Sequence, residues 1–459
     1  MKYLATLSLS LLLCSPVAAT TVSQPYAEPP LRDLGLSLTL LANVPDVYGD
    51  SRPNGSVPYG DGSGRLLLTD RTGVAYTVAP NGTLSPLLDA RSLVPTMTYG
   101  SEQGLQAAVR HPKDGNLLLT VTTESVNPNL DARLFKLPTG STLPIDHYDV
   151  VSEWNPTTSK RNVLMVIEQW GYDHNTNQPL CLADGSCLIP VGDGGNTVYS
   201  GTVGKFGFGQ RLDSPLGTLL RIIPNGDGTY GVPKDNPFVG DGDSATLAEI
   251  YAYGFRNPQR GYVRADGTLV WIDMGQANAE EVNAIVAGGN YGWPRREGNY
   301  CVVANDETVL EDCGSQAGFI DPVAAYDHGA GLADQLARRA IGGIAACEGC
   351  GIPELEGDTL AIDLATGALL HELPGGLFEE LLLGGKTFAQ RLGLDRVEAR
   401  LGVDETGGLL LISRLEGTVY HLQRSAEIPI GSTAALALPG LALLLLPGRR
   451  RLHRRTAVS

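Results

Sequence analysis

Tyr251-Ala-Tyr-Gly-Phe-Arg-Asn-Pro-Gln259, Trp271-Ile-Asp-Met-Gly-Gln-Ala-Asn-Ala-Glu-Glu-Val-Asn283 and Gly288-Gly-Asn-Tyr-Gly-Trp-Pro294 are the three most informative runs of the sequence. The second run places two carboxylates, Glu280 and Glu281, directly after a loop rich in Gly and Asn. Adjacent like charges repel in a packed turn, whereas carboxylates beside backbone carbonyls suit Ca²⁺, which takes roughly six to eight oxygen ligands. The pair therefore predicts either a calcium site or a solvent-exposed acidic turn.

Short apolar runs also flank these segments along the chain. Examples are Gly64-Arg-Leu-Leu-Leu-Thr-Asp70, Asn116-Leu-Leu-Leu-Thr-Val-Thr122, Thr218-Leu-Leu-Arg-Ile-Ile223 and Gly408-Leu-Leu-Leu-Ile-Ser413. Gly, Asp, Asn or Pro bound each run, and Asp-Gly pairs recur at residues 61–62, 184–185, 227–228 and 266–267, as expected for β-hairpins. Only residues 331–339 suggest a helix. The pattern from residue 30 to 424 predicts an all-β domain, and its length suits a propeller whose blades repeat four strands.

The first residues have the pattern of a secretion signal. Lys2 precedes an apolar run from Leu4 to Cys14, and Val17-Ala18-Ala19 supplies the small residues that a signal peptidase needs. The run is too short to span a bilayer. Residues 1–19 therefore predict export to the periplasm, the outer envelope or the extracellular medium.

Residues 425–459 form a second targeting segment. An uncharged apolar run from Ile428 to Pro447 precedes five arginines, at positions 449, 450, 451, 454 and 455. The run is long enough for one membrane span, and the arginines would stay on the inner side. The alternative, a buried terminal helix, conflicts with Pro439 and Pro447. The order of short motif, span and arginine cluster resembles tails of the PEP-CTERM sorting type, so sorting and membrane attachment both stay open.

Charge and cysteine spacing narrow the possibilities further. The net charge of −16 argues against a nucleic-acid partner, because the phosphate backbone attracts basic surfaces. Cys14 leaves with the signal, and the other six cysteines form the close pairs Cys181/Cys187, Cys301/Cys313 and Cys347/Cys350. Close pairs in an exported protein predict disulfides. A zinc site at Cys347 and Cys350 is the alternative, but it needs two more ligands.

The segments 254–259, 280–283 and 288–294 together are similar to the core signature of the soluble quinoprotein glucose and aldose sugar dehydrogenases. The non-catalytic hedgehog-interacting proteins share that propeller. Weaker similarity covers roughly residues 35–422, including Glu102-Gln-Gly-Leu105 and His111-Pro112. The resemblance implies a six-bladed β-propeller.

The resemblance also implies cofactors. Arg256 and Asn257 would contact pyrroloquinoline quinone (PQQ), and the backbone carbonyls of Gly275 and Gln276 would hold its Ca²⁺. A second Ca²⁺ would be held by two carboxylates and one backbone carbonyl, those of Glu280, Glu281 and Tyr291.

The segment Asp173-His-Asn-Thr176 carries the catalytic prediction. Sugar oxidation by hydride transfer needs a base, and neutral His is the usual one near pH 7. By the resemblance, His174 is this base, Asp173 orients it, and Glu102 lies near the sugar. A Gly192-Asp-Gly-Gly195 turn follows at the interval that the family shows. The alternative is a structural histidine, which is the commoner role of a lone His.

Two functions remain open at this point. The first is a PQQ- and calcium-dependent enzyme that oxidises the C1 hydroxyl of an aldose or oligosaccharide and passes electrons to an extracytoplasmic acceptor. The second is a calcium-stabilised, non-catalytic propeller that binds polysaccharide or protein at the cell envelope. His174 together with Arg256 and Asn257 favours the first. A cofactor-binding Lys of the family falls near Ala365, which favours the second, although Arg396, Arg400 or Arg414 could replace its charge.

Overall fold

The computed structural model describes residues 21–23, 25–46, 52–100, 102–128, 131–138, 141–195, 208–303, 306–314, 316–329 and 340–425. The expected signal (1–19), the expected helix (331–339) and the apolar run with its arginines (from 428) lie outside these residues. Residues 1–424 form one compact unit, and Ser425 begins a second. Across the described ranges, no helix is long and apolar enough to span a membrane.

The described residues of the first unit are almost entirely β. Three sheets come first along the chain. Their strands are β4 (Pro53–Pro58), β5 (Leu66–Asp70), β6 (Val74–Val78) and β7 (Leu84–Asp89) in one sheet; β8 (Leu105–Arg110), β9 (Leu118–Glu124), β10 (Arg133–Phe135), β11 (His147–Asn155) and β12 (Lys160–Gln169) in the next; and β13 (Leu180–Cys181), β14 (Cys187–Val191), β15 (Thr218–Pro224), β16 (Tyr230–Gly231) and β17 (Ile250–Tyr253) in the third.

Three more large sheets and one small sheet follow. The large ones contain β18 (Pro258–Val263), β19 (Leu269–Asp273), β20 (Ala279–Ile285) and β24 (Ala324–Asp327); β25 (Ile341–Ala346), β26 (Thr359–Asp363), β27 (Leu369–Leu373), β28 (Leu377–Leu382) and β2 (Leu31–Asp33); and β29 (Ala399–Val403), β30 (Leu409–Ser413), β31 (Thr418–Arg424) and β3 (Leu36–Asn43). The small sheet contains β1 (Thr21–Val22), β21 (Arg296–Glu297), β22 (Tyr300–Val303) and β23 (Asp306–Glu311). One short helix, α1 (Phe388–Leu392), follows β28.

Each of the four Asp-Gly pairs lies in a hairpin loop, as predicted. The glycines have positive φ, for example +76° at Gly62 and +93° at Gly228, which favours Gly over residues with a side chain. In each loop the Asp carboxylate accepts the backbone N–H two residues later, as Asp61 does from Ser63 at 3.0 Å. These local bonds satisfy turn amides that have no partner in the sheet.

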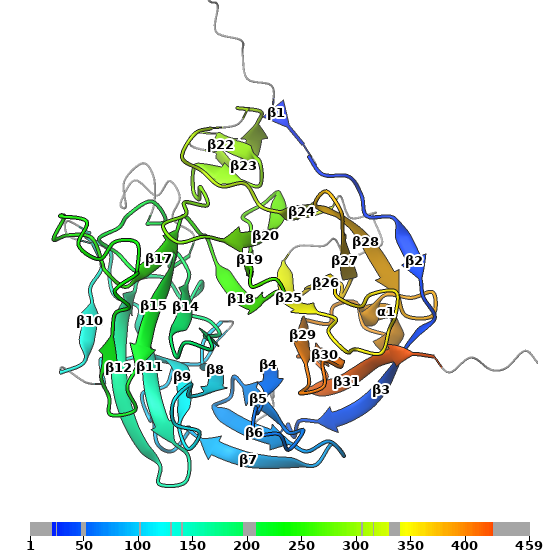
Figure 1. Ribbon diagram of the computed structural model, residues 1–459, viewed down its shortest axis with the longest axis horizontal. Helices are drawn as coiled ribbons and strands as arrows, with labels where there is room; N and C mark the ends of the chain where they lie inside the picture. The colour runs from blue at the N-terminus through cyan, green and yellow to red at the C-terminus, as the bar shows by residue number, and fades with distance from the viewer. Residues whose placement is uncertain are drawn as a thin grey trace, which may run out of the picture. The chain divides into compact units, whose positions relative to one another are not determined.

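The large sheets follow one another around a common centre (Figure 1). One strand of each large sheet, β4, β8, β14, β18, β25 or β29, lies nearest this centre (Figure 1), and contacts join β4 to β8, β14 to β18, β18 to β25, β25 to β29 and β29 to β4. β3, from the start of the chain, pairs with β31 from its end, with Leu38 opposite Leu422, so the first and last strands share a sheet. Apolar residues of neighbouring sheets pack together, as Leu360 does with Leu401 and Leu411, which explains why many strands are apolar on both faces.

The three predicted disulfides are present. They join Cys181 to Cys187, Cys301 to Cys313 and Cys347 to Cys350. Glu356 lies close to the sulfurs of Cys347 and Cys350, but those sulfurs are bonded to each other. The alternative of a zinc site at this pair is therefore wrong in the oxidised chain.

Candidate active site

The amino-terminal ends of the inner strands surround a cavity of ≈140 Å³ at the centre of the domain. Its lining combines residues from six separate parts of the chain, which no local sequence motif could bring together. They are Asn54, Arg71, Glu102, Gln106, Asn177, Gln259, Met274, Ala340, Leu364, Arg396, Glu398, Arg400 and Arg414. Four of them are arginines and two are glutamates, so the lining carries an excess of positive charge.

Three of the arginines, Arg71, Arg400 and Arg414, are buried and repel one another. Burial lowers the pKa of Arg71 to about 9, and the charge of Arg414 adds to this effect. Burial and the neighbouring arginines also lower the pKa of Arg400. The Nε atoms of Arg400 and Arg414 are buried and have no hydrogen-bond partner among the described residues. Buried donors without partners are costly, so the cavity fits an anionic group that would accept from them.

His174 lies beside this cavity, next to the lining residue Glu102, and its ring is hydrogen-bonded to a carboxylate. Its Nδ1 is 2.6 Å from the Asp193 Oδ1, and both side chains are buried. Asp193 is held in turn by Trp293, whose Nε1 donates to Oδ2 at 2.7 Å, and by the Gly195 N–H at 2.9 Å. Among the described residues, none hydrogen-bonds the other ring nitrogen of His174. The arrangement leaves Nε2 available to a substrate.

The expected orienting role of Asp173 is therefore corrected: Asp193, in the Gly192–Gly195 turn, holds the ring. Asp173 lies close by, near Gly195, and burial raises the pKa of its carboxyl. Sequence adjacency suggested Asp173, but the ring's hydrogen-bond partner comes from a turn 19 residues further along the chain. In the sequence, the Gly192-Asp-Gly-Gly195 turn was the feature that could have pointed to Asp193.

Glu102 fixes the backbone of the His174 segment. Its Oε2 accepts the His174 N–H at 3.0 Å, and its backbone carbonyl accepts from the Asn175 side chain at 2.6 Å. His174 has φ of +55°, a left-handed conformation that is unfavourable for a residue with a side chain. Although burial raises the pKa of the Glu102 carboxyl, the charges of His174 and Arg71 lower it overall. The carboxylate thus stabilises a strained position.

A second buried histidine supports the same segment. The Nε2 of His147 is 2.8 Å from the Asn175 Oδ1, and its Nδ1 is 2.9 Å from the Asp146 Oδ2. The Asp149 carboxylate also accepts the Thr176 N–H at 2.6 Å. Burial lowers the pKa of His147, but Asp149 and Asp146 raise it overall. Sequence reasoning missed this network, because its members come from β11 and from the loop after β12.

Arg256 and Asn257 follow shortly after the end of β17, and one carboxylate accepts both of their backbone N–H groups. The Asp273 Oδ2 accepts the Arg256 N–H at 2.9 Å, and Oδ1 accepts the Asn257 N–H at 2.7 Å. The Asn257 side chain accepts from Asn177 at 3.3 Å and from Gln259 at 2.8 Å. Asn177 and Gln259 both line the arginine-rich cavity. The structure thus places Arg256 and Asn257, the residues predicted to contact PQQ, at the edge of the arginine-rich cavity.

The predicted cation-binding carbonyls face a positive charge in this structure. The Nη1 of Arg256 donates to the Gly275 carbonyl at 2.7 Å and to the Met274 carbonyl at 3.1 Å, and its Nε donates to the Gln276 Oε1 at 2.8 Å. The loop around Gly275 and Gln276 is fixed by Glu297, whose Oε1 accepts the backbone N–H groups of residues 276–279 at 2.9–3.1 Å. The oxygens therefore converge on a cationic position, which fits a metal ion if Arg256 moves aside.

Glu280 and Glu281 are buried, so the alternative of an exposed acidic turn is wrong. They lie on β20, where successive side chains point to opposite faces. Glu280 contacts the His328 Nε2 at 2.5 Å and the Ile341 N–H at 2.9 Å. Glu281 instead accepts from the Gly298 N–H at 2.6 Å and from Asn283 at 3.1 Å. The expectation that both carboxylates hold one ion is not met.

The Glu281 face of β20 retains the chemistry of a cation site. Asp273 is its cross-strand neighbour. Burial raises the pKa of Glu281 to about 7, and burial together with the Glu281 charge raises that of Asp273. The Asn283 Oδ1 is buried without a hydrogen-bond partner among the described residues. Such an oxygen-rich, under-neutralised group fits Ca²⁺.

Tyr291 packs on the other side of this region. Its ring stacks on Phe255 at 4.6 Å, and its hydroxyl donates to the Ala284 carbonyl at 2.6 Å. No hydrogen bond joins Tyr291 to Glu280 or Glu281 in the part of the chain that the structure describes. Its predicted role as a metal ligand through the carbonyl stays a prediction.

Comparisons with known proteins agree with this geometry. The family model "Glucose / Sorbosone dehydrogenase" matches residues 52–374. The HIPL2 protein of Arabidopsis thaliana is 26% identical over 322 residues, which cover 59% of this chain and 45% of that protein. Human Hedgehog-interacting protein is 27% identical over 249 residues, covering 50% of this chain and 32% of that protein. The chain thus spans less than half the length of these curated relatives.

Solved structures share the fold. The PQQ-bound form of aldose sugar dehydrogenase from Streptomyces coelicolor matches with a TM-score of 0.55 and 20% identity, covering 86% of this chain and 99% of that one. An identity this low speaks for the β-propeller fold alone. The family match covers more than half of the chain. It includes His174, Arg256 and the inner strands β4, β8, β14, β18 and β25. The chain belongs to the glucose/sorbosone dehydrogenase family.

Proposed function

We propose that this protein is a PQQ- and calcium-dependent dehydrogenase that oxidises the C1 hydroxyl of an aldose outside the cytoplasm. The observation that carries the proposal is the position of His174, bound to Asp193, beside a buried cavity rich in arginine. An anionic cofactor and a base would then lie next to each other. The six large sheets would be six blades, and residues 1–19 would direct export.

In this reaction His174 would accept the proton of the C1 hydroxyl at Nε2. The Asp193 carboxylate faces Nδ1, so Nδ1 carries the proton in the neutral ring and Nε2 is the free base. When Nε2 gains a proton, Asp193 stabilises the resulting imidazolium, as carboxylate partners of catalytic histidines do. Glu102 holds the backbone of His174. PQQ, when bound, would supply the acceptor for the hydride that leaves C1.

The arginine-rich cavity would hold the PQQ carboxylates. PQQ carries three carboxylates, and Arg–carboxylate pairs are strong because they are charge-assisted and can be bidentate. Ala365, near the position of the family's Lys, is buried and offers no charge. Arg400 and Arg414 line the cavity next to Leu364 and have buried Nε donors without partners. Their charges would replace the one that Ala365 lacks.

Calcium would have two places. The backbone carbonyls of Gly275 and Gln276 would bind the ion that accompanies the cofactor. Arg256, which here donates to the Gly275 carbonyl, would then turn toward the PQQ carboxylates. Glu281 and Asp273 would bind a second ion on their face of β20, with Asn283 supplying its unpartnered oxygen. Glu280 would stay with His328.

A non-catalytic propeller is the second candidate. It is favoured by Ala365 and by the similarity to proteins named for hedgehog interaction. In that case the domain would keep calcium and bind a polysaccharide or a protein at the envelope. The residues 425–459 would then attach or sort it there.

Sugar oxidation by the loaded protein separates the two candidates. The purified chain is given PQQ and Ca²⁺, and aldose oxidation is followed with an artificial electron acceptor. The enzyme proposal expects turnover that falls by about 10²–10⁴-fold in His174→Gln, the usual contribution of a positioned base. His421→Gln, on the outer part of β31, is the control and should keep full activity. Absence of turnover with every aldose tried would favour the binding protein.

A further inference from the structure

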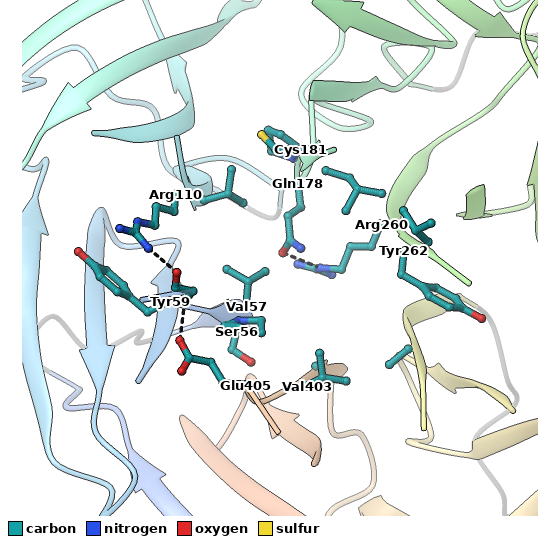
Figure 2. Close-up of a pocket in the computed structure, with 18 of the residues that line it drawn as sticks. Ser56, Val57, Tyr59, Arg110, Gln178, Cys181, Arg260, Tyr262, Val403 and Glu405 are labelled. Carbon is teal, nitrogen blue, oxygen red and sulfur yellow. Dashed lines mark hydrogen bonds between the residues drawn. The ribbon is translucent and has the colours of Figure 1, made fainter. Parts of the chain in front are cut away.

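A second, wider chamber opens at the opposite ends of the same inner strands. The arginine-rich cavity is lined by Asn54, Gln106 and Gln259 at the starts of β4, β8 and β18. The second chamber, of ≈1030 Å³, is lined by the later residues of these strands, such as Ser56, Arg110 and Tyr262 (Figure 2). We call it the lower chamber. No role has been given to it so far.

Arg260 lies at the floor of the lower chamber, between the two hollows. It is 4% exposed. Its guanidinium donates to the backbone carbonyls of Asn54 and Gly342 and to the Gln178 Oε1 at 3.2 Å. Figure 2 shows Gln178 and Arg260 reaching toward each other from neighbouring segments. Gly55 makes room for them, because a Cβ there would lie 2.8 Å from the Arg260 Nη2.

The charge of Arg260 has no acidic partner among the described residues. Burial lowers its pKa to about 9 and the charge of Arg414 lowers it further, with no carboxylate acting in the other direction. Three of the five guanidinium N–H groups have acceptors among the described residues, which leaves one N–H on each terminal nitrogen without one there. A buried cation normally has an anionic partner. The lower chamber is the open side from which one could reach Arg260.

The walls of the lower chamber add unpartnered polar atoms. The Ser56 Oγ and the Arg110 Nε are buried and have no hydrogen-bond partner among the described residues. Two acids of the lining, in contrast, are already satisfied by the backbone. Glu405 accepts the N–H groups of Gly60 and Gly64, each at 2.7 Å, and Asp404 accepts those of Thr406 at 2.8 Å and Gly408 at 2.9 Å. Glu348, the third acid of the lining, is exposed. Apart from it, the groups left for a ligand are mainly donors and one hydroxyl.

From these contacts we infer that the lower chamber is a second ligand site, which binds a sugar acid with its carboxylate on Arg260 and its hydroxyls on Ser56, Gln178 and Arg110. The volume admits a ligand of this size. The rim is braced by the Cys181–Cys187 disulfide. The choice of a sugar acid rests on the proposed function, because C1 oxidation of an aldose gives a lactone that takes up water to become an aldonate.

Calorimetric titration of the PQQ-saturated full chain with sodium D-gluconate tests the inference. One gluconate should bind per chain. Arg110→Gln should weaken this binding by roughly 10-fold and Arg260→Gln by roughly 10- to 100-fold, the range for a hydrogen bond to a charged group. Since Arg260 also binds two backbone carbonyls, Gln178→Ala is a milder second variant and should weaken binding about 5-fold or more.

Arg65→Gln is the matched control. Arg65 and Arg110 both stack on the Tyr59 ring, at 4.5 and 5.5 Å, but Arg65 does not line the lower chamber. Gluconate affinity should be unchanged in Arg65→Gln and in His174→Gln. Loss of binding in His174→Gln with normal binding in Arg110→Gln would place gluconate in the active site and overturn the inference.

Two further ligands test its chemistry. D-glucose has the hydroxyls without the carboxylate, and succinate has carboxylates without the hydroxyls. Each should bind at the lower chamber at least roughly 10-fold more weakly than gluconate, because each lacks one of the two sets of contacts. Equal binding of glucose would overturn the role of Arg260, and equal binding of succinate would overturn the sugar-acid assignment. Turnover of aldose is measured separately, so failure of this inference and failure of the proposed enzyme give different results.

Discussion

The two hollows at the centre of the domain are lined by opposite ends of the same inner strands, such as β4, β8 and β18. At the amino-terminal ends, a small cavity gathers four arginines beside His174 and Asp193. At the other ends, a larger chamber is built from turns, glycines and two disulfide-linked loops around Arg260. The family signature residues cluster at the first end. A motif thus marks a place where neighbouring residues carry the chemistry, whereas a chamber whose polar side chains come from separate strands leaves little trace in the sequence.

The largest expected effect is a loss of aldose turnover that differs between the two aspartates near His174, Asp193 and Asp173. Asp193→Asn removes the charge that holds Nδ1 and stabilises the protonated ring, so turnover with aldose should fall by about 10²–10⁴-fold. Asp173→Asn should lower it far less, because Asp173 makes no hydrogen bond to the ring among the described residues. Initial rates of both variants, loaded equally with PQQ and Ca²⁺, give the answer. Equal losses would return the orienting role to Asp173.

The next effect concerns anion binding at the arginine-rich cavity. Arg414→Gln and Arg400→Gln should each weaken PQQ binding by roughly 10- to 100-fold, because each removes a charge-assisted contact. Arg110→Gln, at the lower chamber, is the matched control and should leave PQQ affinity unchanged. Equilibrium dialysis measures all three. An unchanged PQQ affinity in both Arg414→Gln and Arg400→Gln would show that PQQ does not bind in the arginine-rich cavity.

Calcium should act on one face of β20 and not on the other. Removal of Ca²⁺ with a chelator should lower the melting temperature, since a ligand at a hundredfold its Kd stabilises by about 2.7 kcal/mol. Glu281→Gln should abolish most of this response, whereas Glu280→Gln should keep it because Glu280 binds His328. Differential scanning calorimetry of the three chains tests this. If both substitutions reduced the melting-temperature response equally, Glu280 and Glu281 would share one calcium site.

A smaller effect is expected from the disulfide at the rim of the lower chamber. Replacing Cys181 and Cys187 by Ser together should cost about 2 kcal/mol in the free energy of unfolding, because the closed loop is short. PQQ affinity should not change, since this pair lies away from the arginine-rich cavity. Denaturant unfolding and dialysis measure the two quantities. A loss of PQQ binding would show that the two ends are not independent.

The smallest effect is a pH dependence that involves His147. Its pKa is raised in the folded chain by Asp149 and Asp146 against the effect of burial. Its ionisation therefore stabilises the fold fully below the unfolded pKa of about 6.5, and this contribution is lost as pH rises through the folded value. The difference in unfolding free energy between the wild type and His147→Gln should shrink from pH 6 to pH 9, by about 1 kcal/mol. A constant difference would contradict a charged His147.

The sequence was sufficient for features that depend on neighbouring residues. The four Asp-Gly hairpins and the three local disulfides follow from short-range patterns. Features that depend on side-chain direction were harder. The pair Glu280 and Glu281 was taken as one site although strand geometry separates its members.

Features assembled from distant strands were predicted only in part. Arg400 and Arg414 belong to the hairpin of β29 and β30 and were candidates for the missing charge, but Arg71 joins them only through the packing of different sheets. Asp193 was part of a recognised turn, yet its contact with His174 needed the fold. Arg260 has no motif around it that distinguishes it from a surface arginine. Long-range packing, rather than local chemistry, decides each of these.

The most direct test of the account is the addition of PQQ to the purified, calcium-loaded chain, followed by the absorption spectrum of the quinone. The account predicts a saturable spectral change at one PQQ per chain, present in His174→Gln and weakened in Arg414→Gln. No spectral change, or an identical change in wild type and Arg414→Gln, would contradict the assignment of the arginine-rich cavity to an anionic cofactor.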